Sequence, residues 1–216
     1  MPKNYIEIWG TKSFRPLRII WILEEFNIKY KHHKIGSRTG ETQKPSFLAL
    51  NPKGKIPVLK HKKLVITESI AAVNYIADNF KCLISLLKPK LKKLKVKVDE
   101  WSYFSAMELD CLNLYIIKKH DLKKNLGLSN IYGSSPNAVK AAKEHFNKMI
   151  SSCEGDVPNR GWLLGRKFSV ADIIFVSCLY AANKFKLKID SKVINNYLIR
   201  VKKRSSFLKA INIINS

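Results

Sequence analysis

The sequence predicts an α/β domain followed by an all-α domain. Strand-like and helical patterns alternate up to residue 80, whereas strand signals stop from Pro89 onward. A chain of 216 residues suits one large domain or two small ones. We therefore expect an N-terminal α/β domain over residues 1–80, a linker over 81–88 and a helical domain over 89–216.

The first elements along the chain read strand, helix, strand. Tyr5–Trp9 alternates in character and predicts a strand. After the loop Gly10–Arg15, Pro16 suits the first turn of a helix over Leu17–Phe26. Residues 28–35 return to a strand-like pattern. Because such crossovers are right-handed, we expect the two strands to be parallel neighbours.

Residues 51–80 form the segment on which the functional interpretation depends. Two short apolar runs, Pro57–Leu59 and Leu64–Ile66, are joined by polar residues and predict a β-hairpin. Thr67 is the expected N-cap of the next helix, which carries apolar residues on one face up to Phe80. The chain up to this point gives β-α-β, an irregular segment and β-β-α, which is a thioredoxin-like layout.

Two features of this segment point to a peptide ligand. We expect a cis bond between Ile56 and Pro57, which would turn backbone groups outward to pair with an extended peptide. Glu68 and Ser69 open the following helix, where exposed amide groups and the helix dipole favour an anion. The carboxylate beside them can hold an ammonium group, so an α-amino acid head would find both partners side by side.

The runs NPKGKIPVL, ITES and IAAVNYIADNF resemble the glutathione-binding half of the cytosolic glutathione transferase family. The resemblance implies that glutathione is the co-substrate. It implies that the backbone of Ile56, before the cis-proline Pro57, pairs with the cysteinyl part of glutathione. It also implies that Glu68 and Ser69 hold the γ-glutamyl head and that the side chain of Lys55 contacts glutathione.

The catalytic group in this family lies near the end of the first strand, where a hydrogen bond stabilises the glutathione thiolate. The loop Gly10–Pro16 contains no Tyr and no Cys, so the resemblance implies a Ser- or Thr-type site. Ser13 is the first candidate, because residues 16–18 resemble the segment after the serine in Ser-type members. Thr11 is the alternative.

The helical domain opens with a long amphipathic pattern that ends near His120 and resembles the fourth helix of the family. Tyr103, Met107 and Cys111 follow one another at a spacing of four residues and are expected to line the pocket for the second substrate, with an interdomain core as the alternative. Further on, residues 169–172 have the spacing of a capping box before an apolar helix.

The formal charge of +24 is the unusual bulk property of the chain. The lysines are scattered, which favours compositional drift over a polyanion site, and we expect no specific nucleic-acid binding. No apolar run reaches transmembrane length. The sequence also starts without an apolar signal region, so we expect no membrane partner and a cytoplasmic location.

Histidine and cysteine spacing predicts no metal site and no disulfide framework. His32 and His33 fall on opposite faces of a strand, so we interpret them as surface residues. The cysteines lie far apart and form no CxxC motif. Cys111 and Cys178 lie in apolar helical patterns typical of core positions.

We therefore expect an enzyme that joins the glutathione thiolate to a small hydrophobic electrophile. The resemblance implies a homodimer, and it leaves peroxidase, isomerase or dehalogenase side activities open. The alternative is a non-catalytic, transferase-like module that binds proteins or polyanions. Retention of the glutathione site discriminates between the two hypotheses.

Overall fold

The computed structural model describes residues 5–37, 39–80, 92–121 and 127–216. The chain divides into two compact units, Met1–Lys88 with Lys202–Ser216, and Pro89–Val201. The expected linker, residues 81–88, lies outside the described residues.

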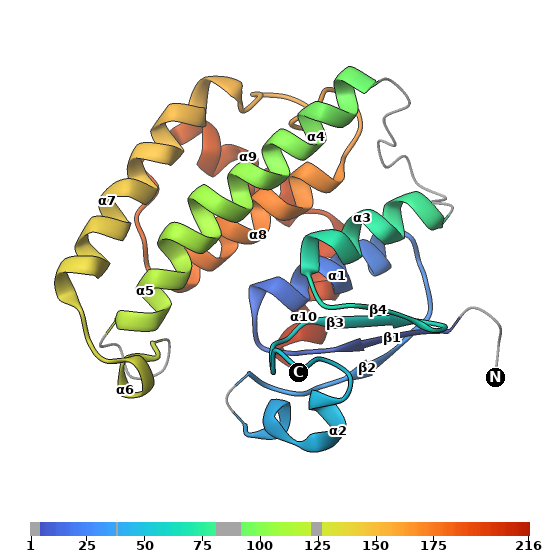
Figure 1. The fold of residues 1–216 in the computed structure, drawn as a ribbon. Helices are drawn as coiled ribbons and strands as arrows, with labels where there is room; N and C mark the ends of the chain where they lie inside the picture. Colours follow the sequence, from blue (N-terminus) through green and yellow to red (C-terminus); the bar gives the residue numbers. More distant parts are fainter. Residues whose placement is uncertain (1–4, 38, 81–91, 122–126) are drawn as a thin grey trace. The chain divides into compact units, whose positions relative to one another are not determined.

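The first unit contains a four-stranded mixed sheet with flanking helices (Figure 1). Its elements are β1 (Ile6–Trp9), α1 (Phe14–Glu25), β2 (Tyr30–His33), η1 (Glu41–Gln43), α2 (Pro45–Leu48), β3 (Val58–His61), β4 (Leu64–Ile66), α3 (Ser69–Asn79) and α10 (Ser205–Asn215). The strand order is β2-β1-β3-β4, with β1 parallel to β2 and antiparallel to β3. This confirms the predicted thioredoxin-like layout.

The core of the first unit lies between the sheet and α1. Ile6 and Ile8 of β1 are fully buried, as the alternating pattern of the strand requires. Helix α1 contacts α3 and α10, whereas α2 lies on the other side of the sheet (Figure 1). Asn27 ends α1 in the left-handed conformation, with φ of 51°.

Helix α10 packs on α1 rather than with the helices that precede it in the sequence. The expected helical domain had included these residues. The ring of Phe207 packs edge-on against Trp21, with ring centroids 4.8 Å apart. The carbonyl of Ile214 accepts hydrogen bonds from the Thr11 hydroxyl and the Lys12 amide, each at 3.0 Å. The last helix therefore completes the first unit.

The second unit is helical, as predicted. Its elements are α4 (Lys92–Phe104), η2 (Ser105–Leu114), α5 (Tyr115–His120), α6 (Ser129–Tyr132), α7 (Pro136–Cys153), η3 (Glu154–Asp156), α8 (Val170–Lys184) and α9 (Lys192–Lys202). Helices α4, η2 and α5 follow one another without a break and end at His120 as expected, but the π-helical turns of η2 were not predicted. Cys178 is buried whereas Cys111 is exposed, so the core interpretation is wrong for Cys111.

Helix α8 forms the core of the second unit. Most of its residues are buried, and it contacts α4 and η2. Its N-terminus carries the predicted capping box of Ser169 and Asp172. The buried Asp172 carboxylate accepts hydrogen bonds from the amides of Leu163 and Ser169 and from the hydroxyls of Ser169 and Tyr197. Burial raises the pKa of this carboxyl group.

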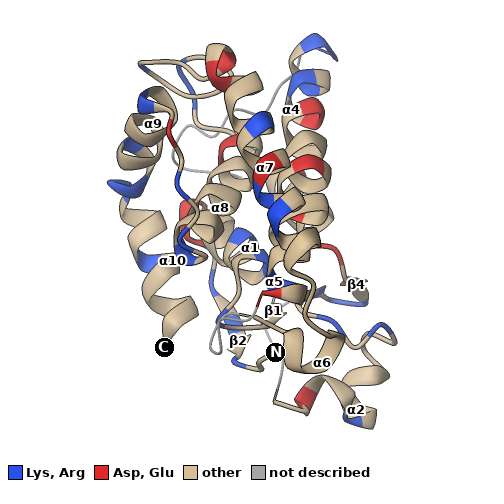
Figure 2. Cartoon of the chain, turned by 90° about the vertical axis from the view of Figure 1, so that its left-hand side faces the viewer, with Lys and Arg blue, Asp and Glu red and all other residues tan. Residues whose placement is uncertain are grey.

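Basic residues occur on elements of both units, among them α4, α7, α9 and α10 (Figure 2). This distribution agrees with the scattered lysines of the sequence. Within the described ranges, no helix is both long and apolar enough to cross a membrane.

Candidate functional site

The loop before β3 carries the first part of the candidate site. The Ile56–Pro57 peptide bond is cis, as the sequence predicts. Pro57 is buried and Ile56 is half-buried. Within the described part of the chain, the backbone amide and carbonyl of Ile56 make no hydrogen bond. Both groups therefore remain available to an extended peptide.

The preceding turn is fixed by Asn51, which is fully buried. Its side-chain amide donates to the carbonyl of Lys55 at 2.7 Å, and its side-chain oxygen accepts from the amide of Lys53 at 3.2 Å. Gly54 takes a φ of 60°, a conformation that glycine adopts at little cost. The side chain of Lys55 remains exposed at the end of this turn.

The start of α3 forms the second part of the site. Glu68 is the N-cap residue and Ser69 is the first helical residue, so the expectation that Thr67 caps this helix is wrong. Helix α3 carries no acidic residue in its first turn, and the Glu68 side chain does not cap it. No acidic side chain of its own first turn therefore neutralises the positive end of this helix, which is the kind of position that favours an anion.

Arg18 of α1 contacts the first residue of α3, and the sequence did not predict this contact. Its guanidinium donates to the Ser69 hydroxyl oxygen at 3.2 Å, and both side chains are buried. Because that oxygen accepts from Arg18, the hydroxyl proton of Ser69 can point elsewhere and donate. The only sequence signal was a charged residue inside the apolar run of α1.

Glu68 is exposed beside this buried pair. Its carboxylate accepts a hydrogen bond from the ammonium group of Lys53 at 2.5 Å, with side chains 74% and 47% exposed. Such an exposed pair contributes little to stability, so an incoming ammonium group can replace Lys53 at small cost.

The loop after β1 forms the third part of the site. Gly10 has a φ of 129°, and a Cβ atom there would lie 2.9 Å from Pro16 and 3.1 Å from Ile56. The loop therefore approaches both the first turn of α1 and the cis-proline loop so closely that no side chain fits at Gly10. The loop that carries the two candidate hydroxyl residues, Thr11 and Ser13, therefore begins beside Ile56.

The structure separates the two hydroxyl candidates. Thr11 is buried, and its hydroxyl donates to the Ile214 carbonyl. Ser13 is the N-cap residue of α1 and is half-buried, but its side chain does not cap the helix. Among the described residues the Ser13 hydroxyl has no hydrogen-bond partner. It stands at the positive end of a helix without acidic residues in its first turn.

His32 holds the beginning of this loop. Its Nε2 atom lies 2.9 Å from the Gly10 carbonyl oxygen, so Nε2 carries the proton and donates. The Nδ1 atom is buried without a partner among the described residues, and burial lowers the pKa of the ring. The surface interpretation is therefore wrong for His32. The ring of His33 stacks on Trp9, with centroids 4.3 Å apart.

The residues expected to contact the second substrate belong to the second unit. Tyr103 lies in the last turn of α4 and is 65% exposed, and Met107 on η2 is 53% exposed. Cys111 on η2 is exposed as well. Their role as pocket residues stays a prediction.

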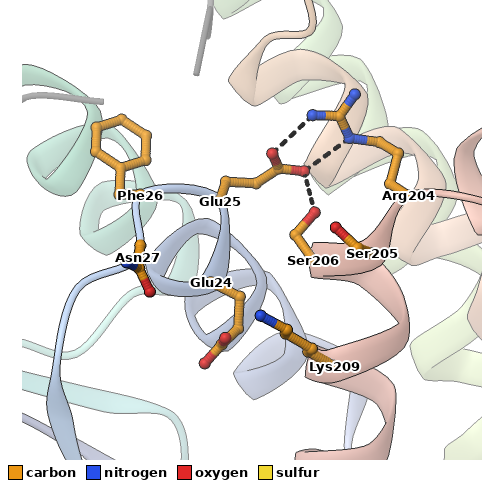
Figure 3. A pocket seen from close by; sticks show the side chains of 8 residues that line it. All are labelled: Glu24, Glu25, Phe26, Asn27, Arg204, Ser205, Ser206 and Lys209. Atoms are coloured by element: carbon orange, nitrogen blue, oxygen red, sulfur yellow. Dashed lines mark hydrogen bonds and ion pairs between the residues drawn. The ribbon is translucent and has the colours of Figure 1, made fainter. Parts of the chain in front are cut away.

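A hollow of about 550 Å³ lies at the other end of α1 (Figure 3). Its central carboxylate, that of Glu25, is buried and fully engaged. Arg204 donates to both of its oxygens, at 2.8 and 2.7 Å, and Ser206 and the Trp21 indole also donate to it. We interpret this cluster as a structural contact that holds α10 against α1.

Metal ligands do not gather anywhere in the described ranges: no group of three or more His, Cys, Asp or Glu side chains could hold an ion there.

Comparison with known proteins decides the family. Residues 6–78 match the glutathione S-transferase N-terminal domain, and residues 111–197 match the C-terminal domain. Glutathione S-transferase A of Pleuronectes platessa is 34% identical over 179 residues, covering 80% of this chain and 75% of that protein. The chain belongs to the glutathione S-transferase family.

Other proteins to which this chain is similar are more distant. Maleylacetoacetate isomerase of Pseudomonas aeruginosa is 24% identical over 193 residues, covering 88% of this chain and 85% of that protein. The theta class glutathione S-transferase of Xanthomonas axonopodis pv. citri, solved with glutathione bound, has a TM-score of 0.80 at 21% identity. The match covers 98% of each chain. At that identity the likeness supports the fold.

Proposed function

We propose that this chain is a glutathione transferase that joins the glutathione thiolate to a small hydrophobic electrophile. The proposal rests on the Ser13 hydroxyl at the start of α1, which has no hydrogen-bond partner among the described residues. It belongs to the same unit as the cis-proline loop and the start of α3. A non-catalytic module would have no need to keep these three features together.

Glutathione would bind in an extended form along these features. The γ-glutamyl carboxylate accepts from the Ser69 hydroxyl and the amide end of α3, and its ammonium group pairs with Glu68. The cysteinyl part pairs with the backbone of Ile56, and Lys55 contacts the peptide by its side chain. The thiol then points toward the loop between Gly10 and Ser13.

The chemistry depends on stabilising the thiolate. The Ser13 hydroxyl donates to the sulfur, and the positive end of α1 favours the negative charge. A thiol titrates near about 8.5, so a modest downward shift of its pKa greatly increases the thiolate present at neutral pH. The sulfur lone pair forms a bond to the electrophilic carbon, and either a leaving group departs with its electron pair or an addition product takes up a proton.

The second substrate would meet Tyr103, Met107 and Cys111, whose exposed side chains suit a small hydrophobic molecule. The same thiolate can serve isomerase chemistry, the activity for which one relative is named. Peroxidase and dehalogenase side activities rest on the same thiolate.

We further propose a homodimer in the cytoplasm. The dimer rests on family membership, and analytical ultracentrifugation at micromolar concentration checks it; a monomer contradicts it. The location is supported by Cys111, Cys153 and Cys178, because these described cysteines form no disulfide, as suits a reducing compartment.

Calorimetric titration with glutathione tests the proposal. The wild-type chain should bind, and Ser69→Ala should weaken binding by roughly 1–3 kcal/mol because a buried donor to the carboxylate is lost. Ser46→Ala on α2, an exposed serine outside the site, is the matched control. Absence of binding to the wild-type chain, or equal binding by Ser69→Ala, would contradict the placement.

A further inference from the structure

A cavity of about 440 Å³ lies in the second unit, which contains none of the proposed glutathione-binding residues. It opens between the second half of α4, the end of α7 with η3, and the loop before α8. Its volume falls within the range of small-molecule sites.

The walls of this cavity are aromatic and aliphatic. Trp101 and Phe104 of α4 line it together with Leu163 and Leu164. The Trp101 ring is held edge-on between Phe104 and the buried Phe175, with centroid distances of 5.9 and 5.1 Å. These contacts fix the Trp101 ring, so the cavity presents a preformed aromatic wall.

The loop side of the cavity is equally constrained. Leu163 is 9% exposed, and its amide donates to the buried carboxylate of Asp172 at 2.9 Å. The loop is thus tied to the capping box of α8. The wall of this cavity is therefore preorganised and needs little rearrangement when a ligand binds.

Cys153 at the end of α7 contributes an apolar surface rather than a nucleophile. Its thiol is buried and donates to the Ile150 carbonyl at 3.3 Å. Burial raises the pKa of this thiol to about 12, so it is neutral at physiological pH. The cavity is therefore built for reversible binding.

Charge at the rim is negative, although the whole chain carries +24. Lys97 and Glu100 pair across one turn of α4 at 2.5 Å, so their charges compensate each other. The exposed Asp156 forms no ion pair within the described ranges. Glu100 and, to a lesser degree, Asp156 act on Lys97 and raise the pKa of its ammonium group. The lining nevertheless holds two carboxylates against one ammonium group, beside two aromatic rings. Both carboxylates and aromatic faces attract cations.

We propose that this cavity is a second binding site, separate from the glutathione site, for a flat aromatic molecule that carries a cationic amine. The rings of Trp101 and Phe104 contact the aromatic part, and Asp156 pairs with the amine. The ligand binds reversibly and independently of glutathione.

Titration with the fluorescent cation 9-aminoacridine tests this site, with the anion 1-anilinonaphthalene-8-sulfonate as a probe of opposite charge. Leu164→Trp fills the cavity and should abolish 9-aminoacridine binding. Asp156→Asn should weaken it and Lys97→Gln should tighten it, each by about two- to fivefold at low salt. Asp99→Asn, which makes the same charge change on α4 outside the lining, is the matched control. Saturating glutathione should leave the affinity unchanged.

Labelling with 5-fluorotryptophan locates the probe independently of the cavity-filling variant. The resonance assigned to Trp101 by Trp101→Phe should shift on adding 9-aminoacridine, whereas those of Trp9 and Trp21 in the first unit should not. The proposal is overturned if Leu164→Trp binds as tightly as the wild-type chain, if glutathione displaces the cation, if the anion binds more tightly, or if the Trp101 resonance is unmoved. If Leu164→Trp does not fold, Ser152→Phe at the rim takes its place.

Discussion

Replacing Ser13 by Ala should raise the pKa of the bound glutathione thiol without destabilising the protein. The Ser13 hydroxyl does not cap α1, so its loss costs the fold little. A hydrogen bond to a charged group contributes about 1.5–3 kcal/mol. At about 1.36 kcal/mol per pKa unit, the thiol pKa should rise by about 1 to 2 units.

The conjugation rate should be proportional to the fraction of bound glutathione that is present as thiolate. Well below the thiol pKa, Ser13→Ala should lower the conjugation rate by about tenfold or more, because each pKa unit removes tenfold of the thiolate. Raising the pH should restore part of the rate. Glutathione affinity should stay nearly unchanged, since the other proposed contacts are at Ile56, Glu68 and Ser69. Ultraviolet titration of the bound thiolate, with rates for an aryl chloride, measures both effects.

Thr11→Val is the control, because it removes a hydroxyl and keeps the shape of the side chain. It deletes the hydrogen bond to Ile214 and leaves that carbonyl with the amide of Lys12. We expect a loss of about 1 kcal/mol in the free energy of unfolding and an unchanged thiol pKa. The assignment to Ser13 is refuted if Thr11→Val raises the thiol pKa and Ser13→Ala does not. If neither does, another group holds the thiolate.

Three further predictions concern stability. Asp172→Ala should lower the free energy of unfolding by about 3 kcal/mol or more, since several buried donors lose their acceptor; denaturant melts check this, and a loss below about 1 kcal/mol would contradict it. Arg204→Met should cost roughly 3–5 kcal/mol in the same assay because it leaves the Glu25 carboxylate buried and unpaired; adding Glu25→Gln should recover part of that cost. Burial lowers the pKa of His61, so the unfolded chain binds its proton more readily; stability should be level above about pH 6.5 and fall below it, and His61→Phe should flatten that fall.

Much of the first unit could be predicted because its signals are local. The hairpin, the helix after Ser69 and the cis bond at Pro57 each depend on neighbouring residues. In the second unit the same holds for the capping box at Asp172. The composition of the loop between Gly10 and Pro16 likewise left two candidates, Ser13 and Thr11, for the hydroxyl donor that the family resemblance implies.

The contacts that sequence reasoning missed join residues far apart in the chain. The support of Ser69 by Arg18 spans 51 positions, and the bond that engages Thr11 spans 203. No periodicity encodes such pairs, because each partner looks ordinary in its own segment. Cys111 was misplaced for another reason: an apolar neighbourhood indicates a helix but not which face of a π-helical turn meets solvent.

The return of α10 to α1 sets the order in which this protein can be completed during synthesis. The first unit lacks the partners of Glu25 and Trp21 until residues 204–207 have left the ribosome. Domains fold as units while the chain emerges, so the second unit has all its residues first. The first unit is consequently the last to complete its fold, although most of its residues are synthesised first. Until then the Glu25 carboxylate, which is buried in the completed unit, and the apolar face of α1 are exposed to water and to chaperones.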